Sequence, residues 1–432
     1  SASLVGSEMC IRDRSCAVVN AQKVTVLPND VVNGYVYIGS ALSNNGKYIA
    51  GSDMSGGIFV ADIQSGEVKW KAGEDKLGAE LRGVTNDGLG CGYDGPALVF
   101  DFKTGISTFI DENESIAESI TPDGKFIVGS ADWEQGFITH PRLWRRGDDG
   151  TYVKEALCEP NNSYLGYNSL GGSARFISAD GSMIVGDLCY GILYPAVSWF
   201  LNSDETSYSV FPISHRFLNL TDDDSRPYIK FQAAGLSSNG KWIAVELTDK
   251  DSKTGTSIFG RYNTETEVLE LPEFDPSVTS LTADYDEGFM AYKIADDGTM
   301  VFVAGSTNGT RIPGIWKAGE KSPRLLSEEY PEATEIAKYD ENLYNTPVDI
   351  TPDARYILLV GTVDYSGMPL YETYLLDTQA EGTGVEEINI EKSADLSNVK
   401  RYTIDGRRTS TPVSGVNIVV GPSGKARKVL VK

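Results

Sequence analysis

The sequence predicts an all-β chain that folds as a seven-bladed β-propeller of four-stranded blades, with a small β tail at the C-terminus. One strand–turn–strand motif recurs seven times between residues 35 and 378. Apolar and polar residues alternate with a period of two along the strands, and no long amphipathic helix interrupts them. The 45 Gly and 22 Tyr residues suit many short strands joined by tight turns.

Each copy of the motif reads as an apolar residue, a small or hydroxyl residue, any residue, Asp or Asn, Gly, and then an apolar strand. The Asn-Gly and Asp-Gly steps need a positive φ, which Gly adopts at little steric cost, so each copy predicts a hairpin turn. The seventh copy has Ala in place of Gly, which indicates a distorted or closing blade. In chain order, the turn position holds Gly46, Gly88, Gly124, Gly181, Gly240, Gly298 and Ala354.

The strands after each turn complete the predicted blade. The third strand of every copy carries an aromatic residue, and a fourth strand follows, as at residues 67–70 and 106–110. A ring of sheets closes when one end of the chain adds a strand to the last blade, so we expect residues 23–27 to form the outer strand of the seventh blade. The third-strand aromatic residues are Phe59, Phe100, Trp144, Trp199, Phe259, Trp316 and Tyr374.

Two of these motifs resemble known repeats. The Thr-Pro-Asp-Gly-Lys turn at residues 121–125 and the Ser-Ala-Asp-Gly turn at 178–181 are similar to turns of TolB-like and tryptophan–aspartate-repeat propellers. Val-Gly after the second strand, and Pro-x-x-Trp at 141–144, resemble the HAF-type extracellular repeat. The resemblance implies a propeller over residues 35–378. It implies no particular function, because such propellers host binding modules, scaffolds and enzymes alike.

The N-terminal residues 1–21 form a separate segment. Residues 3–14 resemble a translated sequencing adapter, and Val19-Asn20-Ala21 fits the small-x-small cleavage pattern of a signal peptide. We expect the mature chain to begin near Gln22. An ordinary disordered N-terminus remains the alternative interpretation.

The remaining boundaries place the propeller at residues 22–378, a linker rich in Gly, Glu and Ser at 379–398, and a β tail at 399–432. The tail resembles a shortened type IX secretion C-terminal sorting domain at residues 402–407, 415–419 and 428–432. A plain β-hairpin appendage is the alternative. The signal-peptide remnant and the tail together predict a protein that is secreted or at the outer cell surface, or that is periplasmic.

Composition and missing motifs exclude several classes of function. A formal net charge of −23 argues against a nucleic-acid partner, and no apolar run is long enough to span a bilayer. The two histidines, His140 and His215, are too few for catalytic zinc, so no metal or cofactor is expected. No catalytic motif is present, which favours a non-enzymatic protein. We also expect a monomer. Cys158 and Cys189 either form a disulfide or remain as buried thiols.

Aromatic residues are expected on the loops that join second to third strands, where propellers usually bind ligands. Planar side chains displayed on loops stack on sugar rings or clasp a peptide. Packing onto their own blade is the alternative interpretation. The candidate ligand-binding residues on these loops are Trp133, His140, Tyr190, Tyr194 and Tyr365.

A second set of candidates lies six positions before each turn, on the innermost strand. Arg82, Glu118 and Arg175 of this set are expected to ring the channel near its mouth. They form either a charge lattice that bridges the blades or a site for an anionic group, because Arg suits bidentate carboxylate recognition. The full set is Ser40, Arg82, Glu118, Arg175, Ala234, Tyr292 and Val348.

These observations favour an exported, non-enzymatic propeller that binds a glycan or a peptide at its loop-rich face. One alternative is a polysaccharide-acting lyase or hydrolase that uses His140 and neighbouring acids. The other is a cell-surface scaffold for protein interactions.

Overall fold

The computed structural model describes most of the propeller and the four strands of the tail. The chain divides into two compact units, a propeller at 24–379 and a C-terminal unit, and each is described by itself. The described residues are 24–30, 34–74, 78–134, 138–159, 171–188, 195–217, 227–251, 255–282, 288–305, 311–331, 333, 336, 344–365, 368–380, 400–403, 408–409, 415–420 and 426–431.

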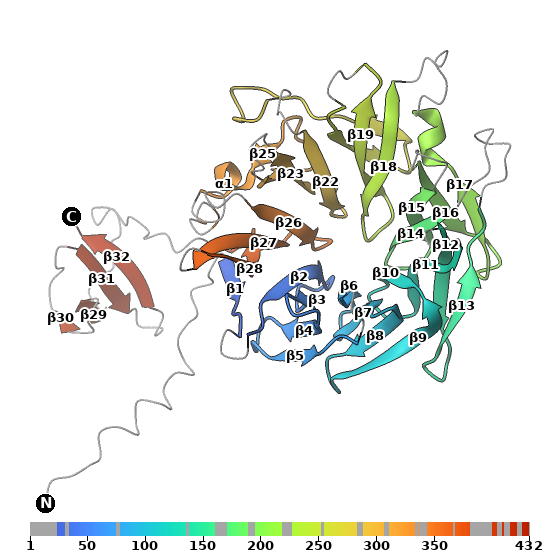
Figure 1. The fold of residues 1–432 in the computed structure, drawn as a ribbon. Helices are drawn as coiled ribbons and strands as arrows, with labels where there is room; N and C mark the ends of the chain where they lie inside the picture. Colours follow the sequence, from blue (N-terminus) through green and yellow to red (C-terminus); the bar gives the residue numbers. More distant parts are fainter. Residues whose placement is uncertain are drawn as a thin grey trace, which may run out of the picture. The chain divides into compact units, whose positions relative to one another are not determined.

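The first unit is a seven-bladed propeller of antiparallel four-stranded sheets, as the repeat predicts (Figure 1). In blades 1 to 6 the strands follow chain order from the channel outwards. Blades 1 to 3 consist of β2 (Tyr37–Leu42), β3 (Tyr48–Asp53), β4 (Ile58–Asp62), β5 (Val68–Lys71); β6 (Glu80–Val84), β7 (Leu89–Tyr93), β8 (Pro96–Asp101), β9 (Ile106–Glu114); and β10 (Ile116–Ile120), β11 (Phe126–Glu134), β12 (Ile138–Arg146), β13 (Tyr152–Ala156).

The remaining blades follow the same plan, with a 3-10 helix at Ile213–Arg216 and a short α-helix, α1, at Leu326–Glu329. Neither of these helices, nor any other in the described part of the chain, is long and apolar enough to cross a membrane. Blades 4 to 7 consist of β14 (Gly172–Ile177), β15 (Met183–Leu188), β16 (Ala196–Leu201), β17 (Tyr208–Phe211); β18 (Tyr228–Leu236), β19 (Trp242–Asp249), β20 (Ile258–Asn263), β21 (Val268–Glu270); β22 (Phe289–Ile294), β23 (Met300–Gly305), β24 (Arg311–Trp316), β25 (Arg324–Leu325); and β26 (Asn345–Ile350), β27 (Tyr356–Tyr365), β28 (Met368–Asp377), β1 (Val24–Leu27).

Blade 7 is closed by a strand from the N-terminal end of the propeller, which confirms the prediction for residues 23–27. The order in this sheet is β1-β28-β27-β26, and the first strand lies beside the last strand of the propeller in Figure 1. Val24 pairs with Leu376 and Leu27 with Thr373 in antiparallel register. The two side chains are buried, whereas Val26 between them is exposed. This closure removes the free edge that an open ring would leave.

The turns between first and second strands are held by a hydroxyl clasp that explains the hydroxyl residue in the motif. In blade 3, Thr121 Oγ1 donates to Asp123 Oδ1 at 2.8 Å and accepts the backbone N–H of Phe126 at 3.1 Å. The same two contacts recur around Ser43, Thr85, Ser178, Ser237 and Thr351, each of which is buried.

The seventh turn forms although it lacks Gly. Ala354 adopts a φ of 56°, in the left-handed region that Gly occupies at the other six turns. The predicted distortion of this turn is therefore a strained φ and not a changed path of the chain.

The third-strand aromatic side chains form the main packing layer between blades. All seven predicted residues, from Phe59 to Tyr374, are at most 1% exposed. Phe259 of blade 5 contacts aromatic residues of blade 6: its ring centroid lies 5.3 Å from that of Phe289 and 5.9 Å from that of Trp316. Burial of each such side chain removes a large apolar area from water, so this layer is the core of the fold.

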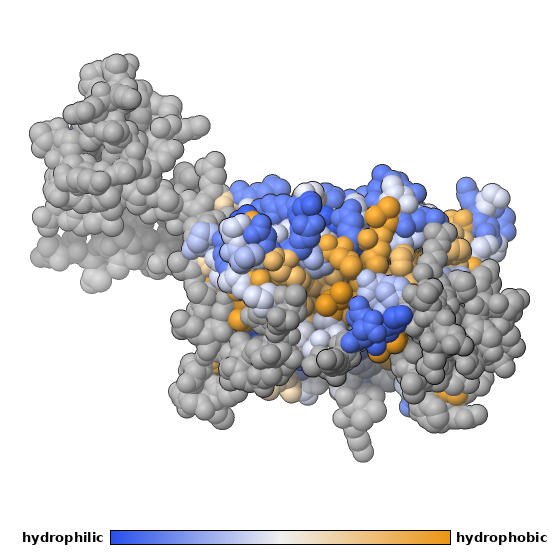
Figure 2. All heavy atoms as spheres, turned by 90° about the horizontal axis from the view of Figure 1, so that it is seen from above, coloured by the Kyte–Doolittle hydropathy of each residue, from blue (hydrophilic) through white to orange (hydrophobic). Residues whose placement is uncertain are grey.

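The outer strands leave some apolar side chains exposed. Ile106, Phe109 and Val268 belong to the outer strands β9 and β21, and each is more than 40% exposed. Figure 2 shows hydrophobic residues between hydrophilic ones on the side of the propeller that it draws.

The second unit contains a four-stranded sheet, in the order β30-β29-β31-β32. The predicted adapter-like segment, signal-peptide remnant and linker lie outside the described residues, apart from positions 379 and 380. The strands are β29 (Lys400–Thr403), β30 (Arg408–Thr409), β31 (Gly415–Val420) and β32 (Ala426–Val431).

Candidate functional site

One β-bulge recurs in the innermost strand of every blade. Each first-to-second strand pairing skips the residue six positions before the turn, and the blade 5 pairing has a second register shift at Ile229. A bulge leaves its extra residue unpaired and changes the direction of the side chain. The seven bulge residues are Ser40, Arg82, Glu118, Arg175, Ala234, Tyr292 and Val348.

Six of these seven bulge residues line one cavity of about 630 Å³ at the mouth of the central channel. The exception is Ala234 of blade 5. The cavity lies where the inner strands begin, at the end of the channel away from the turns and on the face of the second-to-third connections. We call it the mouth cavity. Its remaining lining residues are Ile38, Gly39, Met54, Glu80, Phe176, Lys293, Tyr344, Val360 and Tyr371.

Arg82 links blades 2 and 3 in the mouth cavity, as the lattice interpretation expects. Its Nη1 lies 2.7 Å from Oε1 and 2.8 Å from Oε2 of Glu118, and its Nε lies 3.1 Å from Glu80 Oε2. Burial alone would lower the pKa of Arg82, but the charges of Glu118 and Glu80 outweigh it and hold the pKa above its ordinary value. Both carboxylates are therefore engaged by one guanidinium, and these three side chains together carry a formal charge of −1.

Arg175 is engaged on one side only. Its Nη1 donates to Asp187 Oδ2 and to the carbonyl oxygen of Ala233 in blade 5, both at 3.0 Å. The side chain remains 41% exposed. A guanidinium has five N–H donors, and among the described residues only Nη1 of Arg175 makes hydrogen bonds, so Nε and Nη2 have donors to spare. Asp187 lies behind it, and burial raises the pKa of this carboxyl despite the neighbouring charge of Arg175.

Lys293 is the third cation of the mouth cavity, and it lies next to the bulge residue of blade 6. Its Nζ lies 4.7 Å from the centroid of the Phe176 ring, and the guanidinium carbon of Arg175 lies 5.2 Å from the same centroid. Within the described residues no carboxylate forms an ion pair with Lys293. Two cations from blades 4 and 6 therefore share one aromatic ring.

Tyrosine side chains form another part of the wall. Tyr344 and Tyr371 contact edge to face, with ring centroids 5.7 Å apart. Tyr292 also lines the cavity, and burial raises the pKa of its phenol. These rings offer flat apolar surfaces together with hydroxyl groups.

Below the mouth cavity the channel narrows to a throat of about 90 Å³. The apolar residue two positions after each bulge residue lines this throat in all seven blades. These positions are apolar in every copy of the repeat, which predicts a packing layer between blades. The structure places them around the channel. They are Leu42, Val84, Ile120, Ile177, Leu236, Ile294 and Ile350.

The predicted loop candidates lie elsewhere. Trp133 and His140 belong to strands β11 and β12 and not to a loop, because the β11–β12 hairpin continues pairing out to Glu134 and Ile138. Trp133 is 39% exposed. Neither residue lines the mouth cavity.

His140 has an acidic partner, as the enzyme alternative supposes. Its Nδ1 lies 2.7 Å from Oε1 of Glu159, and both side chains are about three-quarters buried. The pair lies in blade 3, outside the mouth cavity.

Three of the aromatic candidates cannot be placed as side chains. Tyr190 and Tyr194 lie outside the described residues. Tyr365 is the last residue of β27, and its backbone pairs with Met368. The second-to-third connection at 363–370, expected to be a loop, is therefore mostly a paired hairpin. The Tyr365 side chain is not among the described parts of the structure.

Cys158 and Cys189 were the two cysteines expected either to form a disulfide or to remain as buried thiols. Cys158 is exposed and not buried, and its thiol lies 3.1 Å from the carbonyl oxygen of Tyr208. Cys189 lies outside the described residues.

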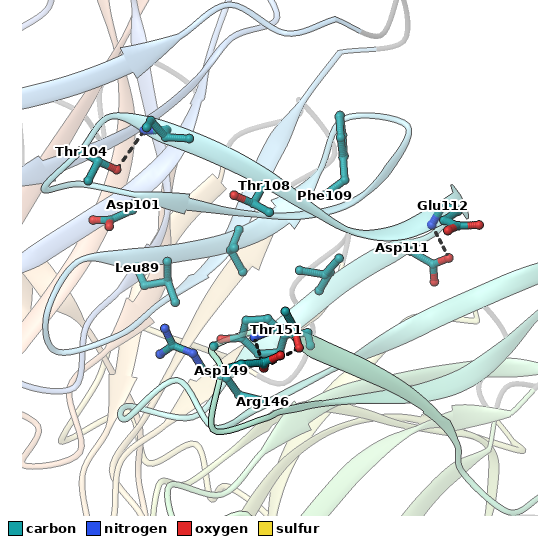
Figure 3. A pocket seen from close by; sticks show the side chains of 15 residues that line it. Leu89, Asp101, Thr104, Thr108, Phe109, Asp111, Glu112, Arg146, Asp149 and Thr151 are labelled. Atoms are coloured by element: carbon teal, nitrogen blue, oxygen red, sulfur yellow. Dashed lines mark hydrogen bonds between the residues drawn. The ribbon is translucent and has the colours of Figure 1, made fainter.

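A second cavity, of about 570 Å³, lies between the outer parts of blades 2 and 3 (Figure 3). Its polar groups are largely bonded to one another: Asp149 Oδ1 accepts from the hydroxyl of Thr151 at 2.6 Å, and Asp111 Oδ1 accepts the backbone N–H of Glu112 at 2.8 Å. Phe109 adds an exposed apolar side chain.

Sequence reasoning missed Lys293, Phe176, Tyr344 and Tyr371. A signal for the first two exists, because each follows a bulge residue directly. Tyr344 precedes β26 and Tyr371 lies within β28, and no repeat position marks them.

The comparisons with known proteins agree with the architecture. No family model and no curated protein sequence matches the chain. Among solved structures, oligogalacturonate lyase from Vibrio parahaemolyticus is 14% identical over 82% of this chain and 93% of that one, with a TM-score of 0.49. The Swd1 β-propeller domain of Myceliophteria thermophila is 12% identical over 79% and 99%, with a TM-score of 0.46. TolB from Acinetobacter baumannii is 16% identical over 67% and 65%, with a TM-score of 0.34.

The blades, their order and their closure thus define the class: a seven-bladed β-propeller with TolB among its structural neighbours. Likeness at this level of identity concerns the fold and not the function.

Proposed function

We propose that the protein is a non-enzymatic binding propeller that holds part of a soluble glycan in the mouth cavity. The observation that carries the proposal is the convergence of the bulge residues of six blades on one cavity of about 630 Å³. Small-molecule sites are commonly concave and of about 300–1,000 Å³. In this proposal the protein acts as a monomer outside the cytoplasm, as the sequence predicts.

The lining of the cavity supports a glycan rather than a peptide. Hydroxyl, carboxylate, guanidinium and ammonium groups surround the space, and a sugar offers hydroxyl groups to each of them. The rings of Tyr344 and Tyr371 supply flat faces on which a sugar ring can stack. A peptide remains the competing ligand.

The test is a binding assay of the full chain against panels of soluble oligosaccharides and short peptides, by isothermal titration calorimetry. We expect an oligosaccharide to bind, and Tyr371→Ala to weaken it about tenfold, because an aromatic contact contributes about 1.4 kcal/mol. Thermal melting of each variant separates lost binding from lost folding.

Trp133→Ala is the matched control, because this side chain is also a partly exposed aromatic group but lies outside the cavity. It should bind as the unchanged protein does. Binding that depends on Trp133 and not on Tyr371 would place the ligand on the β11–β12 hairpin and reject the mouth cavity. Binding of peptides alone would reject the glycan.

A second candidate function, cleavage of a polysaccharide, is favoured by the His140–Glu159 contact. A histidine held by a carboxylate is an arrangement suited to general base catalysis. Product formation from a panel of polysaccharides, lost in His140→Ala and kept in Tyr371→Ala, would support this alternative over binding alone.

A further inference from the structure

The distribution of charge in the mouth cavity differs from that of the whole chain. The protein carries a formal net charge of −23, yet three cations, Arg82, Arg175 and Lys293, line this cavity beside two carboxylates, Glu80 and Glu118. Both carboxylates contact Arg82. These three groups together carry a formal charge of −1, so the positive charge that can attract an anionic ligand comes from Arg175 and Lys293.

The neighbouring acids are turned away from the cavity. Asp187 is 10% exposed at its side chain and accepts bonds from Arg175 Nη1 and from the backbone N–H of Ala233. Asp349, in the throat, accepts the backbone N–H groups of Leu42 and Ile350 at 2.8 and 2.9 Å. Neither carboxylate lines the mouth cavity, and burial raises the pKa of both, which favours their uncharged forms.

Small residues in blade 5 bring the two cations to one place. The bulge residue of that blade is Ala234, which is followed by Gly235. A Cβ at Gly235 would lie 2.7 Å from the carbonyl oxygen of Tyr292 and 3.0 Å from the Cα of Lys293, so the absence of a side chain lets blade 6 approach closely. Phe176 of blade 4 can thus lie near Lys293 of blade 6.

The three side chains form one arrangement around an aromatic ring. The guanidinium of Arg175 and the ammonium of Lys293 each lie about 5 Å from the centroid of Phe176. The ring attracts both cations but does not neutralise them, because a cation–π contact is weaker than an ion pair and brings no negative charge. The spare N–H donors of Arg175 match the geometry of a carboxylate.

We propose that Arg175 and Lys293, which both contact the ring of Phe176, form a subsite for a carboxylate, and that the mouth cavity selects sugars that bear one, such as uronates. This inference rests on the proposed function, since it names the chemical class of the glycan. Neutral sugars carry no negatively charged group to pair with Lys293, so they bind less tightly. Attraction to the two cations also makes the affinity depend on salt.

The experiment compares uronate trisaccharides with their carboxyl-reduced counterparts, which keep the same sugar rings but carry no charge. Calorimetry with the full chain should show at least tenfold tighter binding of the uronate form. Lys293→Met, which keeps the length of the side chain and removes its charge, should remove most of that preference, so that the affinities for the two forms of the sugar become nearly equal. Lys293→Arg should retain it.

Lys103→Met is the matched control, because Lys103 is an exposed lysine outside the cavity, 3.1 Å from Asp87. The affinity of Lys103→Met for the uronate should equal that of the unchanged protein. Raising the salt concentration should weaken uronate binding in the unchanged protein and in Lys103→Met, and much less in Lys293→Met. Thermal melting confirms that each variant is folded.

The outcomes separate this inference from the proposed function. Equal affinity for the two forms of the sugar, unaffected by Lys293→Met, would overturn the carboxylate subsite while the glycan site stands. Tighter binding of a sulfated or phosphorylated sugar than of the uronate would overturn the carboxylate as the recognised group. Failure of every sugar to bind would reject the glycan, and an acidic peptide that needs Lys293 would replace it.

Discussion

The side-chain amide of Asn44 donates a hydrogen bond to the hydroxyl of Ser238 at 2.8 Å. Asn44 belongs to the first turn of blade 1 and Ser238 to that of blade 5, and these two blades are not neighbours in the ring. The bond therefore crosses the channel at its turn end, and both residues line the throat of about 90 Å³. A side-chain contact therefore bridges the channel at its turn end, at the throat below the mouth cavity.

Breaking this cross-channel bond should lower stability by a modest amount. Asn44→Ala removes the donor, and we expect the free energy of unfolding to fall by about 1 kcal/mol, the usual net contribution of one hydrogen bond. Urea denaturation measures the change. Ser238→Ala and the double variant complete a thermodynamic cycle, in which the two losses should not add. Strict additivity would show that the contact contributes nothing to stability.

The seventh turn should be improved by restoring the Gly of the other six. Ala354 has a φ of 56°, where a side chain costs about 1–2 kcal/mol, and Gly relieves this at an entropic cost of about 0.4–1 kcal/mol. We expect Ala354→Gly to raise the free energy of unfolding by about 1 kcal/mol. Gly240→Ala is the reverse change at the equivalent turn of blade 5, where φ is 73° and a Cβ meets no atom closer than 3.7 Å. Gly240→Ala should lower the free energy of unfolding by a similar amount. A lower free energy of unfolding in both variants would refute the strain at Ala354.

The turns and packing layers could be predicted from the sequence because they depend on local patterns. Asp-Gly and Asn-Gly specify a left-handed φ within two residues, and the buried third-strand aromatic residues recur in every copy. The same alignment located the inner-strand set from Ser40 to Val348. It could not show why that position lines the channel, since a bulge depends on how two strands pair and not on either strand alone.

The aromatic candidates show the limit of local reasoning. Trp133 and His140 were expected on a loop, but the β11–β12 hairpin continues to pair past the point where other blades turn. Strand length is set by cross-strand contacts that no single segment contains. Lys293 was missed for a related reason: its significance comes from Phe176, which lies two blades away and more than a hundred positions earlier in the chain.

Closure of blade 7 should depend on the buried side chains of β1. Leu27 is 6% exposed and packs with Tyr37 of blade 1 and Leu375 of blade 7, so Leu27→Ala should cost about 2–5 kcal/mol of stability. Val26, at 39% exposure on the same strand, is the control, and Val26→Ala should change stability by less than about 0.5 kcal/mol. Urea denaturation compares the two.

Hydrogen exchange gives a second measure of the same closure. The amide groups of β28 pair with β1, so in Leu27→Ala they should exchange faster than those of blade 4. Equal protection of β28 in both variants would mean that β1 does not hold the ring closed.

The carboxyl group of Asp349 should titrate above the ordinary range of an aspartate. Burial raises its pKa, and the charge of Lys293 opposes that rise. Lys293→Met should therefore raise the pKa further, which carboxyl chemical shifts in a nuclear magnetic resonance titration would show. A folded-state pKa above the unfolded value means that this group favours folding when it is protonated. Its contribution to stability is then lost as the pH rises from that of an unfolded aspartate through the folded pKa, and the loss should be larger in Lys293→Met. An unchanged Asp349 pKa in the variant would show that the ammonium group lies too far away to act on the throat, and it would also weaken the placement of Lys293 between throat and mouth.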